Sequence, residues 1–198
     1  MARRAAQALG WRVVDNELVE RVAARAGLAP EDVAQWEERV STFVERLARV
    51  LAAGTPELAV PPQAGGTVPR LEEADLVRIT ENVVAEIAAE GRVVLVGRAA
   101  PAVLAQQGDA MHVKLVAPKS YRIQAAAARL GVNLQKAGAV VDESDSTRAR
   151  YHRQYYQRDW NDPVNYHIVL NTGALGLDGA TSVIVSEAQR RGWGPTRS

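Results

Sequence analysis

Arginine is the residue type in this sequence best suited to bind an anion, and it supplies nearly all of the positive charge. The chain has only three lysines, Lys114, Lys119 and Lys136. A guanidinium group is planar and binds phosphate or carboxylate through paired hydrogen bonds, whereas an ammonium group is a point charge. The composition therefore favours recognition of phosphate or carboxylate. A GC-rich genome also produces abundant alanine and arginine, and it is the simpler explanation for any single arginine.

Acidic residues are followed by arginines along the segment 142–153. They are Asp142, Asp145, Arg148, Arg150 and Arg153. Residues three or four apart are neighbours on a helix, so this spacing by itself predicts a solvated helix face held by ion pairs. Four aromatic residues lie in or just after the segment: Tyr151, Tyr155, Tyr156 and Trp160. Aromatic rings among arginines can stack nucleotide bases, but more often they pack a helix against a sheet.

Other candidates follow two apolar runs that are typical of β-strands, 11–14 and 92–97. The carboxyl ends of parallel strands meet at one edge of a sheet, where ligands bind. Arg98 comes directly after the second run, so we expect it to bind phosphate, with a structural ion pair as the alternative. Asp15 and Asn16 follow the first run, and they are equally suited to cap the next helix.

Arg21 lies one helical turn from Glu17 and can form an ion pair with it, which is the alternative to a ligand-binding role.

The residue content excludes other kinds of site. Absence of cysteine rules out disulfides, a thiol nucleophile and cysteine-ligated metals. The three histidines lack metal-ligand spacing, and no Ser-His-Asp arrangement is present. We therefore assign no metal site beyond Mg²⁺ carried by a substrate.

Composition gives the broad class. The 198 residues are 47% hydrophobic and 24% charged, with a net charge of +1, so we expect a folded domain rather than a disordered chain or a dedicated nucleic-acid binder. No apolar run approaches the length of a membrane span, about 20 residues. The first residues lack a secretory signal, so we expect a cytoplasmic protein that does not bind membranes.

Strand and helix patterns alternate along the chain. Strands are predicted at 11–14, 92–97, 111–117 and 166–171, and helices at 1–9, 17–26, 30–52, 71–90, 100–107, 120–130, 134–157 and 177–190. This order predicts an α/β fold with a parallel sheet and helices on both faces. We expect one domain over residues 1–198, with 29–70 as a helical and loop insertion.

Several motifs occur in an order that resembles the cytidylate kinase-like family. They are Val13-Val-Asp-Asn16 with Arg21, Val94-Leu-Val-Gly97-Arg98, Val113-Lys-Leu-Val-Ala117-Pro118, the Asp- and Arg-rich segment 141–151, and Tyr155 to Thr172. The resemblance covers most of the chain and is best at 8–28 and 92–178. It implies a three-layer P-loop kinase-like fold, a lid-like region at 134–163, and phosphoryl transfer from ATP with Mg²⁺ to CMP or dCMP.

Matching positions imply the roles of individual residues. Arg21 and Arg98 would bind the acceptor phosphate, Asn16 would contact CMP, and Asp145 would recognise its cytosine nucleoside. Arg148, with Arg150 beside it, would reach the donor phosphates. The resemblance also makes Asp15 a candidate to hold metal-bound water. The sequence departs from the main family at Ala99, where an acid is usual, and at Val141, where an arginine is usual.

The phosphate-binding loop of the family is the largest departure. The chain contains no G-x-x-x-x-G-K-[ST], and the central strand of the family's sheet would precede Met1. We therefore expect the first strand, which is central in the family's sheet, to be absent between the strands at 92–96 and 112–116. A shortened reading frame would explain its absence. The alternative is that these neighbours pair directly. As it stands the chain is expected to be inactive.

Three functions follow, in order of preference. The first is a cytidylate kinase-like enzyme, and the second is a non-catalytic nucleotide-binding or regulatory module. The third is a nucleic-acid-binding protein that uses the arginines and aromatic residues of 148–158. CMP or dCMP and ATP are the expected partners, and the helices at 30–52 and 71–90 either cover the acceptor site or form a homodimer contact.

Overall fold

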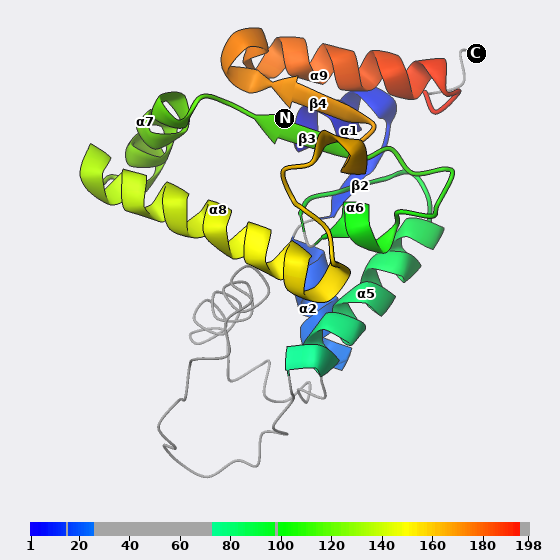
Figure 1. Ribbon diagram of the computed structural model, residues 1–198. Coiled ribbons are helices and arrows are strands. Elements are labelled where there is room, and N and C mark those ends of the chain that lie inside the picture. The colour runs from blue at the N-terminus through cyan, green and yellow to red at the C-terminus, as the bar shows by residue number, and fades with distance from the viewer. Residues whose placement is uncertain (15, 26–72, 98, 195–198) are drawn as a thin grey trace.

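A computed structural model describes residues 1–14, 16–25, 73–97 and 99–194 of the chain (Figure 1). The expected helix at 30–52, the insertion at 29–70, Asp15 and Arg98 lie outside the described residues. The described elements, in chain order, are α1 (Ala2–Leu9), β1 (Arg12–Val14), α2 (Asn16–Arg25), α5 (Glu73–Ala89), β2 (Val93–Leu95), α6 (Ala100–Val103), β3 (Val113–Val116), α7 (Lys119–Leu130), α8 (Leu134–Tyr156), the 3₁₀ turn η1 (Pro163–Asn165), β4 (Ile168–Asn171) and α9 (Thr172–Arg190).

The described strands form two short parallel sheets. β1 pairs with β2, with Val13 opposite Val94, and β3 pairs with β4, with Leu115 opposite Leu170. Within the described ranges β2 and β3 are not paired with each other, so the sheet is divided at the place where the central strand was expected to be absent. The predicted α/β class with parallel strands is confirmed.

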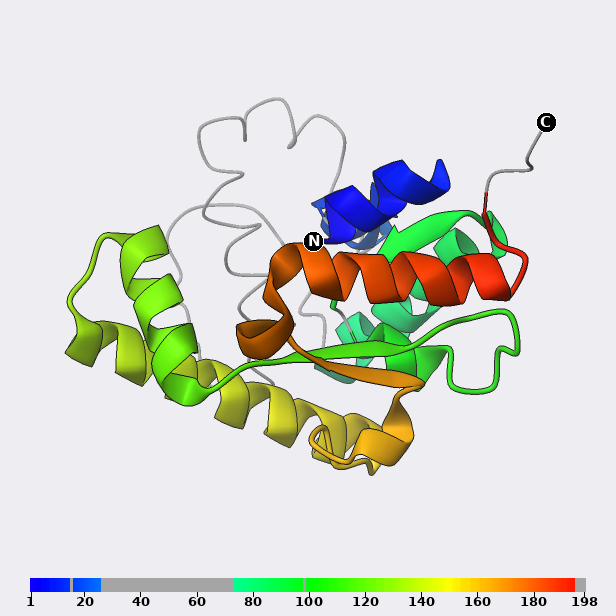
Figure 2. The same ribbon diagram turned by 90° about the horizontal axis from the view of Figure 1, so that it is seen from above.

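Helices lie on both sides of the strands (Figures 1 and 2). α9 packs on β3 and β4, and α1 packs on β1 and also against α9, so that these two helices join the sheets on one side. On the other side α5 packs against α2 and α6. α7 and α8 pack against each other, and α8 runs below the β3–β4 sheet in Figure 2.

The main hydrophobic core lies between α2, α5 and the β1–β2 sheet. Its buried residues are Val14, Leu18, Val22, Val83, Val84, Ile87, Ala100 and Leu104. The helix predicted at 71–90 supplies three of them, Val83, Val84 and Ile87, which recur at helical spacing and whose side chains are fully buried. The helical period of the sequence thus identified the face that α5 presents to the core.

Two local expectations differ from the structure. Continuous apolar runs such as 92–97 and 166–171 are typical of strands buried on both faces, but Val96 and Val169 are 39% and 41% exposed. Among the described strands, β2 and β4 each pair with one neighbour, so one edge of each has no strand beside it. The last helix begins at Thr172 rather than 177, and Gly176, with φ of 65°, kinks it at the boundary that the sequence suggested.

We expect Ile87→Ala to lower the free energy of unfolding by about 2–5 kcal/mol, because it removes a fully buried side chain and leaves a cavity in the main core. Val183→Ala is the control: Val183 is 39% exposed, and its truncation should cost about 0.5 kcal/mol or less. Urea unfolding measures both. Equal effects would contradict the assignment of this core.

Candidate active site on α8 and the turn after β2

The turn between β2 and α6 packs directly against α8. Gly97 and Ala99 both have positive φ, 74° and 52°. This conformation is unfavourable for a residue with a side chain, but Ala99 is buried in a cluster with Val77 of α5 and Tyr151 of α8. Ala99 follows β2 closely in the chain, so this contact sets α8 beside the start of α6, just after the carboxyl end of β2.

An ion pair with two hydrogen bonds joins α7 to α8. The two guanidinium nitrogens Nη1 and Nη2 of Arg122 each lie 2.8 Å from one carboxylate oxygen of Asp145. One turn away, Lys119 Nζ lies 2.7 Å from Asp142 Oδ1. The hydrogen bond to Asp145 raises the pKa of Arg122. Asp145, the candidate for nucleoside recognition, therefore already has a cationic partner.

Arg148 lies one turn after Asp145 on the same helix and is exposed to solvent. Its guanidinium group donates a hydrogen bond to Ser144 Oγ and lies 5.8 Å from the ring centroid of Trp160. Arg150 is exposed on the same helix. The helix thus carries two exposed guanidinium groups within one turn of Tyr151, the residue that contacts the turn after β2.

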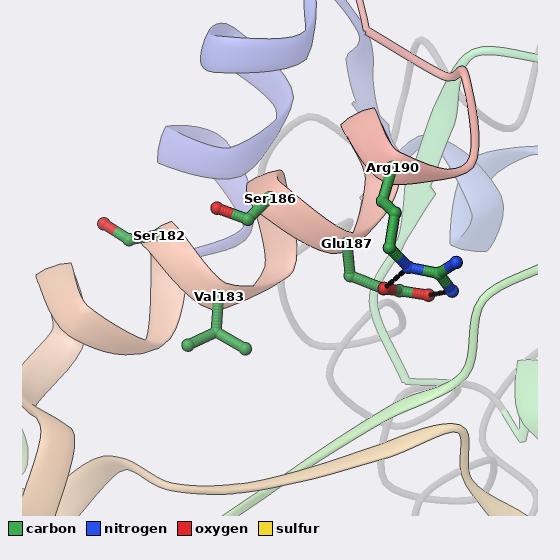
Figure 3. A pocket seen from close by; sticks show the side chains of 5 residues that line it. All are labelled: Ser182, Val183, Ser186, Glu187 and Arg190. Carbon is green, nitrogen blue, oxygen red and sulfur yellow. Dashed lines mark hydrogen bonds and ion pairs between the residues drawn. The ribbon is translucent and has the colours of Figure 1, made fainter.

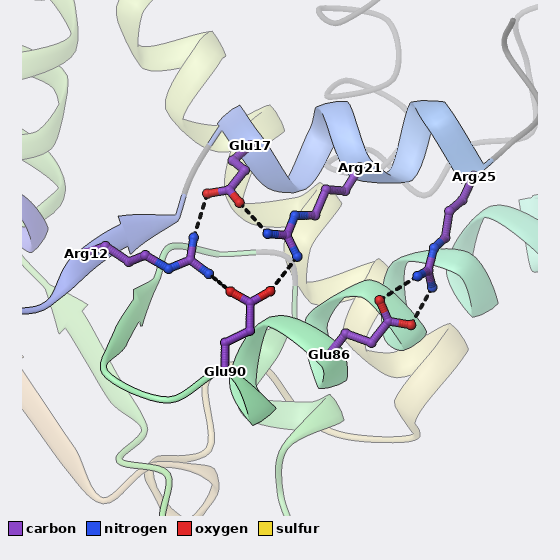
Figure 4. A network of polar contacts seen from close by, with 6 residues as sticks. All are labelled: Arg12, Glu17, Arg21, Arg25, Glu86 and Glu90. Carbon is purple, nitrogen blue, oxygen red and sulfur yellow. Dashed lines mark hydrogen bonds and ion pairs between the residues drawn. The ribbon is translucent and has the colours of Figure 1, made fainter. Parts of the chain in front are cut away.

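Arg21 belongs to a separate network of ion pairs (Figure 4). Its guanidinium nitrogens lie 2.7 Å from Glu17 Oε1 and 2.6 Å from Glu90 Oε1, and Arg12 pairs with the same two acids. The hydrogen bond from Arg21 lowers the pKa of Glu90. Arg12 begins β1 and Glu90 precedes β2, whereas Glu17 and Arg21 lie on α2, so the network ties α2 to the starts of both strands.

The structure therefore brings some of the predicted residues together and leaves others apart. Asp145, Arg148 and Arg150 share α8, which packs on Ala99 after β2, whereas Asp15 and Arg98 lie outside the described residues. Arg21 is held by Glu17 and Glu90, and its bond to Glu17 is the ion pair that the sequence offered as its alternative role. Asn16 begins α2, at the carboxyl end of β1.

Two residues near this site had no role in the sequence analysis. Arg122 lies in the first turn of α7, just after the carboxyl end of β3, and that position was the available signal. Lys114 lies inside β3, and only 7% of it is exposed. A lysine between valine and leucine in a strand was the signal that marked it.

Two surface hollows differ in their relation to this site. One of about 270 Å³ lies at the carboxyl ends of β3 and β4, where Val116 and Thr172 face the α7 residues Arg122 and Arg129. The other, of about 390 Å³, lies along α9 alone (Figure 3). Its acid, Glu187, is paired with an arginine of the same helix, so the second hollow offers no free charge for a ligand. The first lies where ligands of parallel α/β folds bind, and one of its two arginines, Arg122, is already paired with Asp145.

A metal site built by the protein is not supported by the described residues. Within the described ranges, no three His, Asp or Glu side chains gather in a way that could hold a metal ion. None of the described helices is long and apolar enough to cross a bilayer.

The parallel strands, the helices on both sides and the arginine-rich helix beside a strand-to-helix turn define a mixed α/β protein of the kinase-like type. The chain belongs to the cytidylate kinase-like family, whose model matches residues 1–174. A solved structure titled as an uncharacterized protein from Eubacterium ventriosum ATCC 27560 has a TM-score of 0.65 and 22% sequence identity, covering 96% of this chain and 90% of that chain. That likeness concerns the fold alone. Among curated proteins, the comparison found no match.

We expect the protein to lose about 1–2 kcal/mol of stability between pH 7 and pH 5. Burial, with Lys114 and Arg158 nearby, lowers the pKa of His152 to about 4, and burial followed by the charge of His167 lowers the pKa of His112. The unfolded chain protonates His152 below its ordinary pKa, about 6.5, while the folded chain does so only near pH 4, so stability falls as pH falls. The lowered pKa of His112 acts in the same direction.

Urea unfolding at pH 7, 6 and 5 measures this loss. His152→Phe keeps an aromatic ring beside Tyr151 and Tyr156 and should flatten the dependence. An unchanged slope in this variant would contradict the role of His152.

Proposed function

We propose that this protein is a nucleoside monophosphate kinase-like protein that binds CMP or dCMP and supports phosphoryl transfer from ATP accompanied by Mg²⁺. The observation that carries the proposal is the packing of α8 on the turn after β2, through Tyr151 and Ala99. It puts an arginine-rich helix beside the carboxyl end of a parallel strand, where phosphate ligands of such folds bind. Membership of the family supports the same chemistry.

The transfer requires positioning and neutralisation of charge rather than a covalent intermediate. An oxygen of the acceptor phosphate bonds to the γ-phosphorus of ATP while the bond from that phosphorus to the β–γ bridging oxygen breaks, so CMP and ATP become CDP and ADP. We propose that Arg98, Arg21 and Asn16 bind the acceptor, and that Asp145 recognises the nucleoside. Arg148 and Arg150 would neutralise the donor phosphates.

Two of these roles need an exchange of partners. Asp145 is bound by Arg122, and Arg21 by Glu17 and Glu90. The side chains of these pairs are about one-third exposed, and ion pairs at such positions are worth only about 0–1 kcal/mol. A nucleotide phosphate can therefore compete with Glu90 for Arg21, and a base can compete with Arg122 for Asp145.

Binding and transfer are separate parts of the proposal. Backbone N–H groups of a glycine-rich loop hold the donor phosphates in P-loop proteins, and the 198 residues contain no G-x-x-x-x-G-K-[ST]. We expect this chain to bind nucleotide, and to transfer phosphate only where such a loop completes the sheet between β2 and β3. The alternative is a nucleotide-binding module without transfer. Under either function we propose that the protein acts in the cytoplasm and that its partners are small-molecule nucleotides. A homodimer is the assembly to test.

Calorimetric titration with CMP, dCMP, UMP and ATP, together with an assay for CDP formation, tests the proposal. Binding of CMP or dCMP is expected. Binding without CDP formation favours the nucleotide-binding module over the kinase, and absence of binding by all four nucleotides contradicts both.

Arg148→Met should weaken binding of ATP by about tenfold, the loss of one phosphate contact of about 1.4 kcal/mol. Arg153→Met is the matched control, because Arg153 is an exposed arginine on the same helix to which we assign no ligand role. Both affinities come from the same titrations. Equal weakening by the two changes would show that only the net charge of α8 matters.

Arg21→Met should weaken binding of CMP by about tenfold, whereas Arg25→Met should leave it unchanged. The pair is well matched: Arg21 and Arg25 lie on the same face of α2, and each is bound to a glutamate of the α5 segment. Because both changes break an exposed ion pair, their effects on stability should be similar and small. Unchanged CMP affinity in Arg21→Met would leave Arg21 with its ion-pair role alone.

A further inference from the structure

Lys114 is an unusual residue for the middle of a β-strand. It lies within β3 between Val113 and Leu115, and only 7% of it is exposed. Burial of a charge costs free energy unless the charge is paired and hydrogen-bonded, and an apolar residue of similar size is often the more stable choice. Burial accordingly lowers the pKa of Lys114.

The hydrogen-bond and ring partners of the ammonium group all come from the segment between α8 and β4. Nζ donates to the carbonyl oxygen of Trp160 and to Asn161 Oδ1, the latter at 3.0 Å. It also lies 4.0 Å from the ring centroid of Trp160 and 5.2 Å from that of Tyr166. The hydroxyl of Tyr166 donates to the same Trp160 carbonyl at 2.9 Å. Lys114 thus fixes the position of Trp160 relative to β3.

Trp160 connects this lysine to the arginine-rich helix. The guanidinium group of Arg148 lies 5.8 Å from the centre of the Trp160 ring, and it also donates to Ser144 Oγ on its own helix. A ring face attracts a cation and restricts where its side chain can point. The indole of Trp160 therefore orients Arg148 from outside α8, and the indole is held by Lys114.

We propose that Lys114 is a positioning residue that holds Trp160 and, through the Trp160 ring, aims the guanidinium group of Arg148. The proposal rests on the proposed function for the ligand that Arg148 binds. Lys114 itself is buried and does not touch that ligand. It acts on affinity through Arg148, and the expected consequence is coupling between the two positions.

A double-mutant cycle with ATP tests this coupling. Arg148→Met should weaken binding about tenfold and Lys114→Met about fivefold, while the double variant should bind no more weakly than Arg148→Met alone. Losses that multiply to about fiftyfold would overturn the proposal, and so would a Lys114→Met variant with unchanged affinity. Lys136→Met, at an exposed lysine, is the control and should bind ATP like the parent chain.

A spectroscopic measurement tests the positioning without any nucleotide. The Nε–Hε resonance of Arg148 is assigned by its loss in Arg148→Met, and the ring current of Trp160 should displace it. The displacement should disappear in Trp160→Leu and in Lys114→Met, and it should persist in Trp160→Phe and Lys136→Met. An Arg148 resonance that does not change in Lys114→Met overturns the proposal.

The two experiments separate failure of the proposed function from failure of the positioning role. If the parent chain binds no nucleotide, the proposed function fails, and the resonance of Arg148 still decides the role of Lys114. If Lys114→Met does not fold by urea unfolding, Trp160→Leu and Trp160→Phe provide the same comparison from the other side of the contact. If the losses of ATP affinity in Trp160→Leu and Arg148→Met multiply in the double variant, the proposal is overturned.

Discussion

Side-chain packing rather than a shared sheet joins the two halves of the described chain. β1 pairs only with β2 and β3 only with β4 among the described strands, so no ladder of backbone hydrogen bonds runs from one pair to the other. Helices make the connection instead. α1 packs against α9 on one side, and the buried cluster of Val77, Ala99 and Tyr151 joins α8 to α5 and the start of α6 on the other. The candidate site depends on the second contact, because it sets α8 beside the turn after β2.

Charges in the protein fall into two kinds with different physical roles. Arg21 of α2 and Arg122 of α7 are paired with acids near the surface, where water screens the attraction and an anionic ligand can compete for the arginine. Lys114 is buried, its ammonium group contacts oxygens and aromatic rings, and the charges of Asp159 and Asp145 also act on it. The exposed charges suit binding, and the buried one suits positioning.

Most of the described helices and strands could be predicted from the sequence, because each depends on local pattern. The stripe of Val83, Val84 and Ile87 has the helical period, and its face is buried in the main core. Asn133 and Asn171 cap α8 and α9 through their side chains, as short polar residues do at helix starts. Burial was predicted less well: Val96 and Val169 lie in continuous apolar runs, yet they are partly exposed, and among the described strands β2 and β4 each pair with one neighbour.

The sequence by itself determined the α/β class, the order of elements and the family resemblance, since these follow from periodicity and from motifs read along the chain. Tertiary structure decided which charges are paired. The partners Arg122 and Asp145 are 23 residues apart, and Arg21 and Glu90 are 69 apart. Local spacing contains no information about contacts at such separations. The same holds for Lys114, whose burial beneath Trp160 depends on how the segment after α8 folds back onto β3.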